Sequence, residues 1–313
     1  PDHITSLMYK ILEVNANDKI LDAACGSGAF LVKSMSNMIK EVGGINTKEA
    51  KKIKEHSLFG IEFDREIFAL ACANMMIHKD GKTNLEQLDS RDKEASEWIK
   101  SKGITKVLMN PPFERKYGCK KIVENVLNSV PSGIKCAFIM PEKKMEKDKM
   151  GKLLEKHHLE AIIKLPEKLF DAGVTTSIYV FETGKKQVGE IYGCYIEDDG
   201  LERVKNQGRQ DIKDKWMELE NYWVDSIRKR NDTKYGTSQW IDPKKFLSYQ
   251  KPKAEFVLYE EDFVKTMMNY LMFKNKIDVK EFSDKLINKT LYNSEILKED
   301  NNIVIKIKDA EDE

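Results

Sequence analysis

The run Asn110-Pro111-Pro112-Phe113 combines residue types that can hold a flat group carrying an amine. It follows the apolar segment 106–109, which has the length and composition of a buried strand. Each proline fixes its own φ and lacks an N–H, and Pro112 also restricts the residue before it. The carbonyls of Asn110 and Pro111 are therefore free to accept hydrogen bonds, the Asn110 side chain adds another acceptor, and Phe113 offers a flat face. This arrangement suits the edge of adenine. The alternative interpretation is a proline-rich turn beside a phenylalanine of the core. Short motifs also occur by chance, so the residues upstream must decide between the two interpretations.

A glycine turn upstream provides the second signal. The predicted strand 19–24 runs into Gly26-Ser27-Gly28 and then into an amphipathic helix. The two glycines let the backbone approach a ligand closely, and a helix N-terminus favours an anionic group. A dinucleotide fingerprint would need glycine at position 31, which is leucine. With Asp22 in the strand, the pattern Asp-x-x-x-Gly-x-Gly instead resembles motif I of S-adenosylmethionine-dependent methyltransferases.

Two further acids follow predicted strands. Glu62 ends the strand 57–62, and an acid placed there after a glycine turn can hold ribose hydroxyls. Asp64 is the alternative ribose ligand and the expected N-cap of the next helix. Asp89 closes a third strand, within 85–90, where we expect it to meet the amino group of the cofactor's adenine.

Composition sets broad limits. The chain has 313 residues, enough for one large or two modest domains, and its formal net charge is only +1. The five cysteines are scattered without CxxC spacing, which argues against a disulfide framework or a metal site and for a reducing cytoplasm. No apolar run reaches membrane length. Because the chain starts at Pro1 within a helix-start signal, we expect that a preceding segment is missing.

Strands alternate with helices along the first 200 residues, which predicts a doubly wound, mostly parallel α/β sheet of seven strands. The segments 161–165 and 175–182 are joined without room for a helix, so the last strand should be antiparallel. We predict a catalytic domain at 1–200 and a mainly helical extension at 201–313. Two helical stripes of apolar residues fall in that extension, at 211–229 and 263–273.

Several motifs in order along the chain resemble the N6-adenine DNA methyltransferases, most closely the modification subunit of type I restriction-modification systems. The motifs are Asp22-Ala23-Ala24-Cys25-Gly26-Ser27-Gly28-Ala29-Phe30-Leu31, Gly60-Ile61-Glu62, Asp89-Ser90, Asn110-Pro111-Pro112-Phe113 and Leu165-Pro166-Glu167-Lys168-Leu169-Phe170. The chain departs from the family at Ala23 and Thr175, where proline is frequent, and neither position carries chemistry.

The resemblance implies a Rossmann-like, cytoplasmic enzyme that transfers a methyl group from S-adenosylmethionine to the N6 amine of a flipped adenine in double-stranded DNA. The implied cofactor-binding residues are Asp22, Ala24, Gly26, Ser27, Gly28, Phe30, Leu31, Glu62, Asp89, Ser90 and Asn110. The implied catalytic residues are Asn110, Pro111, Pro112 and Phe113, and Phe113 and Phe170 would contact the base. For Phe170, a place in the core is an equal alternative.

The resemblance also implies partners: a separate specificity subunit, a restriction subunit and a second copy of this chain. We expect residues past about 200 to help dock the specificity subunit. Two other readings stay open. Asn-Pro-Pro-aromatic motifs also serve methyltransferases of RNA bases or of protein glutamine, and a non-catalytic subunit that binds DNA or a partner is the third possibility.

Overall fold

The computed structural model describes most of the chain. Its described residues are 2–78, 84–114, 118–147, 151–167, 169–170, 174–204, 208–234, 236–252, 259–292, 294–299 and 302–307. Contacts divide the chain into two units, Pro1–Gln250 and Lys251–Glu313. The described residues do not include Pro1, in the predicted helix-start signal, or Lys168, in the motif 165–170.

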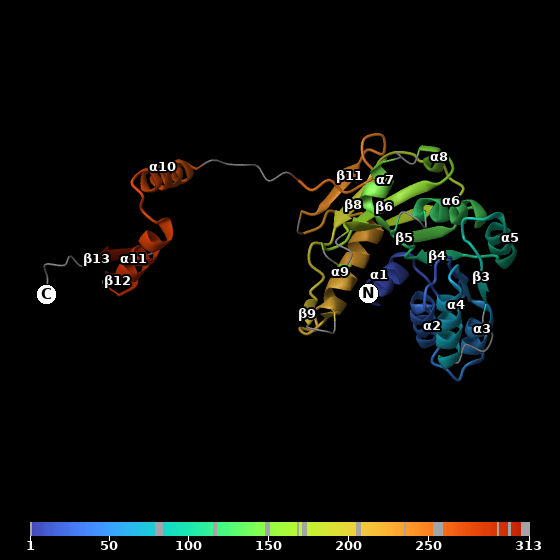
Figure 1. Ribbon diagram of the computed structural model, residues 1–313. Helices are drawn as coiled ribbons and strands as arrows, with labels where there is room; N and C mark the ends of the chain where they lie inside the picture. Colours follow the sequence, from blue (N-terminus) through green and yellow to red (C-terminus); the bar gives the residue numbers. More distant parts are fainter. Residues whose placement is uncertain are drawn as a thin grey trace. The chain divides into compact units, whose positions relative to one another are not determined.

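One large sheet forms the centre of the first unit (Figure 1). Its described strands are β1 (Ile20–Asp22), β2 (Leu58–Glu62), β3 (Leu85–Gln87), β4 (Lys106–Met109), β5 (Lys135–Pro141), β6 (His158–Lys164), β7 (Thr176–Glu182), β8 (Ile191–Tyr195) and β11 (Ser238–Ile241). Their spatial order is β11-β8-β6-β7-β5-β4-β1-β2-β3. The sheet thus has nine described strands rather than the predicted seven, because β8 and β11 extend it beyond β6.

The strand directions follow the expected pattern. The five strands from β3 to β5 run parallel to their neighbours. Strand β7 lies between β5 and β6 and is antiparallel to both, which confirms the direction predicted for it. Strand β8 is parallel to β6, and β11 closes the edge antiparallel to β8.

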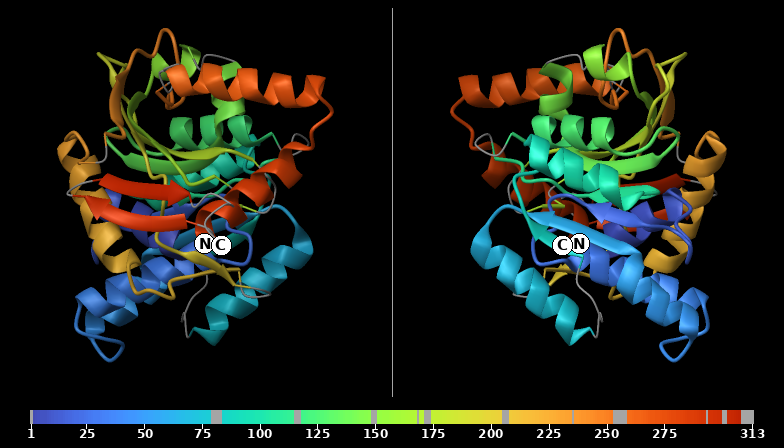
Figure 2. Two further views of the ribbon diagram at one scale, coloured as in Figure 1. Left: turned by 90° about the vertical axis from the view of Figure 1, so that its left-hand side faces the viewer. Right: turned by 90° about the vertical axis from the view of Figure 1, so that its right-hand side faces the viewer.

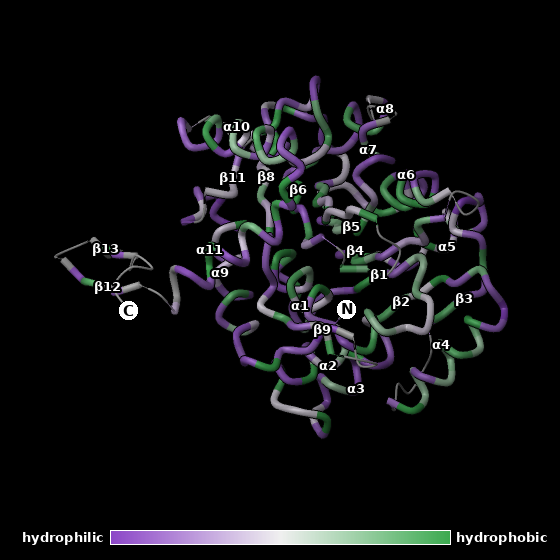
Figure 3. The backbone as a smooth tube through the Cα atoms, turned by 60° about the vertical axis from the view of Figure 1, so that its left-hand side comes forward, coloured by the Kyte–Doolittle hydropathy of each residue, from purple (hydrophilic) through white to green (hydrophobic). Residues whose placement is uncertain are grey.

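Helices cover both faces of the sheet (Figures 1 and 2). One face carries α1 (Asp2–Ile11), α2 (Ala29–Glu41), α3 (Lys48–His56), α4 (Arg65–Ile77) and α9 (Trp216–Lys229), and the other carries α5 (Lys93–Lys102), α6 (Cys119–Ser129), α7 (Glu142–Lys147) and α8 (Gly151–Leu154). Successive strand residues point to opposite faces, so Ile20 joins the core under the first group and Leu21 the core under the second. Figure 3 shows hydrophobic stretches along the central strands and α6.

The boundary between the units differs from the predicted one at residue 200. Residues 201–250 include α9 and β11, and they also include a small hairpin, β9 (Glu202–Val204) with β10 (Gly208–Gln210). Helix α9 contacts α1, and Trp216, Trp223 and Ile227 of its apolar stripe are buried. This stripe therefore completes the core of the first unit and does not form a free docking face.

The second unit contains α10 (Glu260–Lys274), α11 (Val279–Tyr292) and an antiparallel hairpin of β12 (Ser294–Glu299) with β13 (Asn302–Ile307). The helices agree with the predicted helical extension, whereas the hairpin was not predicted. In the part of the chain that the structure describes, no helix is long and apolar enough to cross a membrane.

Candidate active site

The site lies where the order of the strands reverses. Strand β1 pairs with β2 on one side and with β4 on the other. The chain therefore forms β2 and β3 on one side of β1 and then crosses to form β4 on the opposite side. In open α/β sheets, ligands bind at the carboxyl ends of the strands at such a switch point. Asp22 ends β1 and is followed by the glycine turn, while Asn110–Phe113 follows the end of β4, so the fold brings the two motifs to one place.

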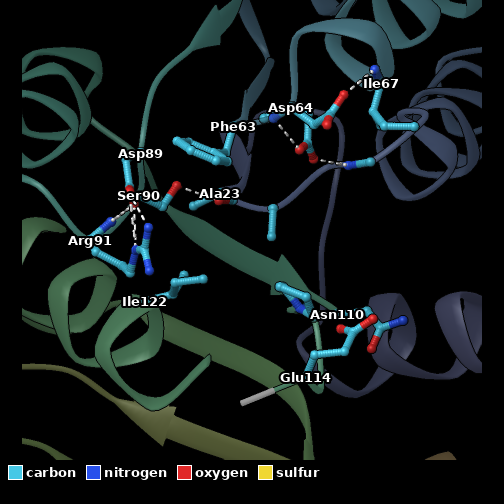
Figure 4. Close-up of a pocket in the computed structure, with 14 residues that line it drawn as sticks. Ala23, Phe63, Asp64, Ile67, Asp89, Ser90, Arg91, Asn110, Glu114 and Ile122 are labelled. Carbon is cyan, nitrogen blue, oxygen red and sulfur yellow. Dashed lines mark hydrogen bonds and ion pairs between the residues drawn. The ribbon is translucent and has the colours of Figure 1, made fainter. Parts of the chain in front are cut away.

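A cavity of about 390 Å³ opens at this place (Figure 4). Seven predicted site residues line it: Ala24, Gly26, Glu62, Asp89, Ser90, Asn110 and Pro112. Asp64, the alternative ribose ligand, also lines the cavity, and Ala23, Phe63, Ile67, Arg91, Glu114 and Ile122 complete the lining. The predicted residues Asp22, Ser27, Gly28, Phe30, Leu31, Pro111, Phe113 and Phe170 are outside this lining.

The glycine turn has the backbone geometry that its residues allow. Gly26 and Gly28 have φ values of +53° and +82°, in the left-handed region that side chains disfavour. Gly28 caps α2 without a side-chain hydrogen bond, and the carbonyl of Ser27 accepts from Asn74 Nδ2 at 2.9 Å. Phe30 is partly buried against the core and Leu31 is fully buried, so the side chains of these two predicted cofactor residues pack into the core.

Glu62 joins the end of β2 to the glycine turn. Its Oε2 accepts from the Gly26 N–H at 2.9 Å, and its Oε1 accepts from the Asp64 N–H at 2.9 Å. Asp64 uses Oδ1 to cap α4, accepting from the N–H groups of Glu66 and Ile67. A carboxylate offers about four acceptor positions, so Glu62 keeps capacity for a ligand hydroxyl.

Asp22 lies beneath the turn and is almost fully buried, with Oδ1 accepting from the Ala24 N–H at 3.1 Å. Burial and the nearby Glu62 carboxylate raise the pKa of Asp22 to about 7, and the Ala24 hydrogen bond opposes this rise. The pair Asp22 and Glu62 is therefore a place where a cationic ligand would be favoured.

Asp89 forms an ion pair with Arg91, whose guanidinium hydrogen-bonds to both carboxylate oxygens. These hydrogen bonds hold the pKa of Asp89 below its usual value. Arg91 also lies 5.9 Å from the centre of the Phe63 ring, and Ser90 donates to the Ala23 carbonyl. Phe63 is 57% exposed, so an apolar ring face borders the cavity. Neither Phe63 nor Arg91 was predicted from the sequence, although each directly follows a predicted acid motif.

The Asn110–Phe113 segment presents the unused acceptor that its sequence predicts. Asn110 Oδ1 is buried and has no hydrogen-bond partner among the described residues. Such an atom is costly unless a ligand or water pairs with it. Phe113 and Phe170 meet edge to face, with ring centroids 5.4 Å apart, and both rings also contact the core. The core alternative for Phe170 is therefore confirmed, and its contact with a base stays a prediction.

Comparison with known proteins adds to this geometry. A sequence model described as N-6 DNA Methylase matches residues 1–135 and 132–235. The chain belongs to this family. It is 30% identical over 300 residues to the type II restriction enzyme and methyltransferase RM.BcgI of Heyndrickxia coagulans, covering 88% of this chain and 45% of that protein. It is 22% identical over 209 residues to the EcoEI methylase subunit, a type I restriction enzyme subunit of Escherichia coli, covering 59% and 42% of the two chains.

Solved structures share the fold of this N-6 DNA methylase family member. The type I restriction enzyme EcoKI M protein aligns with a TM-score of 0.57 and 15% identity, over 67% of this chain and 50% of that one. A chain from a structure of type I restriction-modification complex assembly aligns with a TM-score of 0.63 and 19% identity, over 92% and 66%. At these identities the likeness establishes the methyltransferase fold. The chain spans about half the length of the curated relatives that it matches.

Proposed function

We propose that this chain transfers a methyl group from S-adenosylmethionine to the N6 amine of adenine in DNA, as the methylating part of a restriction-modification system. The buried, unpartnered Asn110 Oδ1 at the edge of the switch-point cavity carries this proposal. Membership of the N-6 DNA methylase family supports it.

The cavity fits the proposed cofactor. Asp22 and Glu62 provide negative charge for a ligand whose reactive sulfur is cationic, while Glu62 keeps acceptor capacity for ribose hydroxyls. Phe63 and Ile67 supply apolar surface for an adenine ring, and Asp89 supplies an acceptor for its amine. The bound cofactor would supply an electrophilic methyl group.

The protein's own residues would act mainly by positioning. The N6 lone pair of adenine is delocalised into the ring, which makes the amine a poor nucleophile. Asn110 Oδ1 and the Pro111 carbonyl would accept its two protons, draw the nitrogen towards tetrahedral geometry and aim the lone pair at the methyl group. The base must leave the duplex to reach such a site.

Phe113 would then stack on the flipped base, a contact worth about 1–3 kcal/mol. In the present arrangement the rings of Phe113 and Phe170 touch edge to face. A base can enter between them only if the two rings separate. We therefore propose that base entry displaces Phe170 from Phe113.

We also propose that the chain works with a separate specificity subunit, a restriction subunit and a second copy of itself, with the Lys251–Glu313 unit docking the specificity subunit. The exposed apolar side chains of Val264, Met268 and Leu271 on α10 motivate this role. Met268→Glu with Leu271→Glu should weaken co-purification with that subunit. Unchanged assembly would exclude the docking role without affecting the proposed reaction.

The reaction is tested by methyl transfer from labelled S-adenosylmethionine to genomic DNA that lacks adenine methylation. Wild type, Asn110→Ala and Asn17→Ala would each be assayed with and without a specificity subunit, and nucleosides would be resolved by mass spectrometry. Asn17 is an exposed turn residue outside the cavity and serves as the matched control. We expect N6-methyladenine with wild type and Asn17→Ala, and a loss of about 100-fold or more with Asn110→Ala.

Other outcomes would direct the assignment elsewhere. Cofactor binding measured by calorimetry, together with no methylation of DNA, would favour an RNA or protein-glutamine substrate. If the cofactor does not bind, the chain would be a non-catalytic subunit. Methylation that survives Asn110→Ala would contradict the role given to the Asn110 side chain.

A further inference from the structure

A lysine from another element holds the end of the Asn110–Phe113 segment. Lys144 lies on α7, which directly follows β5, the strand beside β4. Its ammonium group donates a hydrogen bond to the Phe113 carbonyl. Because Pro111 and Pro112 have no N–H, this segment has few donors of its own with which to fix its position. The carbonyl of Phe113 is therefore an effective point of attachment.

The same ammonium group also reaches the start of the following helix. It lies beside the Cys119 thiol at the beginning of α6, where burial raises the pKa of that thiol and the lysine opposes the rise. Lys144 thus contacts the chain on both sides of residues 114–118. The Phe113 peptide and the α6 N-terminus are tied to one common cation.

Helix α7 is itself held at both ends, so it can serve as a rigid support. At its start, Glu142 accepts from Lys164 Nζ at 3.0 Å and from Ser177 Oγ at 2.7 Å. Near its end, Glu146 Oε1 accepts from the Leu247 N–H at 2.7 Å and from Ser248 Oγ at 2.5 Å.

Between these two anchors, Met145 is completely buried. Lys144 is half-buried and turned towards the Asn110–Phe113 segment, whereas its neighbour Lys143 is exposed. Two adjacent lysines on one short helix therefore have different surroundings.

We propose that Lys144 is a positioning residue for the target base: it fixes the Phe113 peptide and thereby the direction of the ring that receives the flipped adenine. This inference rests on the proposed function. Lys144 is outside the cofactor cavity, so its effect should fall on DNA and not on the cofactor. A ring held in place loses less conformational freedom when a base stacks on it, which is the physical basis of the effect.

The test compares Lys144→Met, Lys144→Arg and Lys143→Met in the full chain, under the conditions in which wild type methylates DNA. Removing a hydrogen bond from a charged donor corresponds to a change of about tenfold to 100-fold. We expect Lys144→Met to lower kcat/KM for DNA by this factor. Lys144→Arg should recover much of the rate because a guanidinium can also donate to the carbonyl. Lys143→Met should behave as wild type, and all variants should bind S-adenosylmethionine equally.

A purely structural role would produce a different result. In that case Lys144→Met would lower the melting temperature and the fraction of active protein, while kcat/KM per cofactor-binding site would stay at the wild-type value. A kcat/KM per site equal to that of Lys143→Met would overturn the proposal while leaving the proposed function intact.

Amide hydrogen exchange provides a test that does not depend on methyl-transfer activity. Lys144→Met should speed exchange in the peptide that carries Phe113 and Glu114, and Lys143→Met should not. If wild type fails to methylate DNA, the proposed function fails, and this exchange comparison still decides whether Lys144 holds the segment. Equal exchange in the two variants would refute the inference.

Discussion

Asp22 should make the stability of this protein fall as the pH rises through the neutral range. Its pKa is about 7 in the folded chain and near its ordinary 3.8 in the unfolded chain. Between these values the folded state binds more protons than the unfolded state, so stability decreases with rising pH. The difference corresponds to about 4 kcal/mol for a side chain this deeply buried. The loss should be complete above about pH 8.

The perturbation that isolates this effect is Asp22→Asn, which keeps the shape of the side chain and removes its titration. About two of the pH units between 3.8 and 7 lie above pH 5, and they correspond to about 2.7 kcal/mol. For a unit of this size 1 kcal/mol shifts Tm by about 2 °C, so the Tm of the variant minus that of wild type should increase by about 5 °C between pH 5 and pH 8. Differential scanning calorimetry across that range measures it. Asp284→Asn, at an exposed carboxylate, is the control and should show no such trend.

Affinity for the cofactor should rise with pH, whereas the stability of the protein falls. The cationic sulfur of S-adenosylmethionine favours ionised Asp22, so wild-type affinity should increase from pH 6 to pH 8, while Asp22→Asn should lose this dependence. Isothermal titration calorimetry at several pH values makes the comparison. In the calorimetric stability experiment, a Tm difference between Asp22→Asn and wild type that does not change with pH would refute the assignment of a raised pKa to Asp22.

Two further predictions concern packing and stacking. Gly60→Ala should lower the free energy of unfolding by about 1–3 kcal/mol, because its Cβ would lie 2.5 Å from Leu85 Cδ2 and 2.9 Å from Leu31 Cδ1; an unchanged midpoint in urea denaturation would contradict this. Phe113→Ala should reduce kcat/KM for DNA by roughly tenfold without changing cofactor affinity, whereas Phe113→Tyr should retain most activity. Fluorescence of 2-aminopurine at the target position should show weaker base stacking only in the alanine variant, and equal signals would argue against this role.

The sequence was sufficient to predict the fold class because its signals are local. Alternating strands and helices, a glycine turn at Gly26 and Gly28, and acids at strand ends follow from neighbours along the chain. The antiparallel direction of β7 also followed, since its connection to β6 is too short for a helix. The edge strand β11 was less accessible. Strand β11 pairs with β8 some 45 residues earlier, a long-range pairing without a local signature.

In the candidate site, too, some features were predictable from the sequence and others were not. The residue types and order of Asp22, Glu62, Asp89 and Asn110 were readable in the sequence, and parallel strands must bring their carboxyl ends to one edge of the sheet. Only the tertiary structure placed Arg91 on Asp89, because that partner depends on side-chain geometry at the cavity. It also decided that the apolar stripe of α9 is buried in the core, since periodicity alone does not say what covers a helix.

The sequence by itself thus determined which acceptor groups the chain offers at 110–113, because backbone constraints and acceptor groups are properties of the residues themselves. The tertiary structure decided which of those groups lack a partner and what holds them in place. Burial of Asp22 and of Asn110 Oδ1, and the reach of Lys144 to the Phe113 carbonyl, depend on elements that lie far apart in the chain. Solvation and hydrogen bonding depend on all neighbours in space, and the order of residues does not contain that information locally.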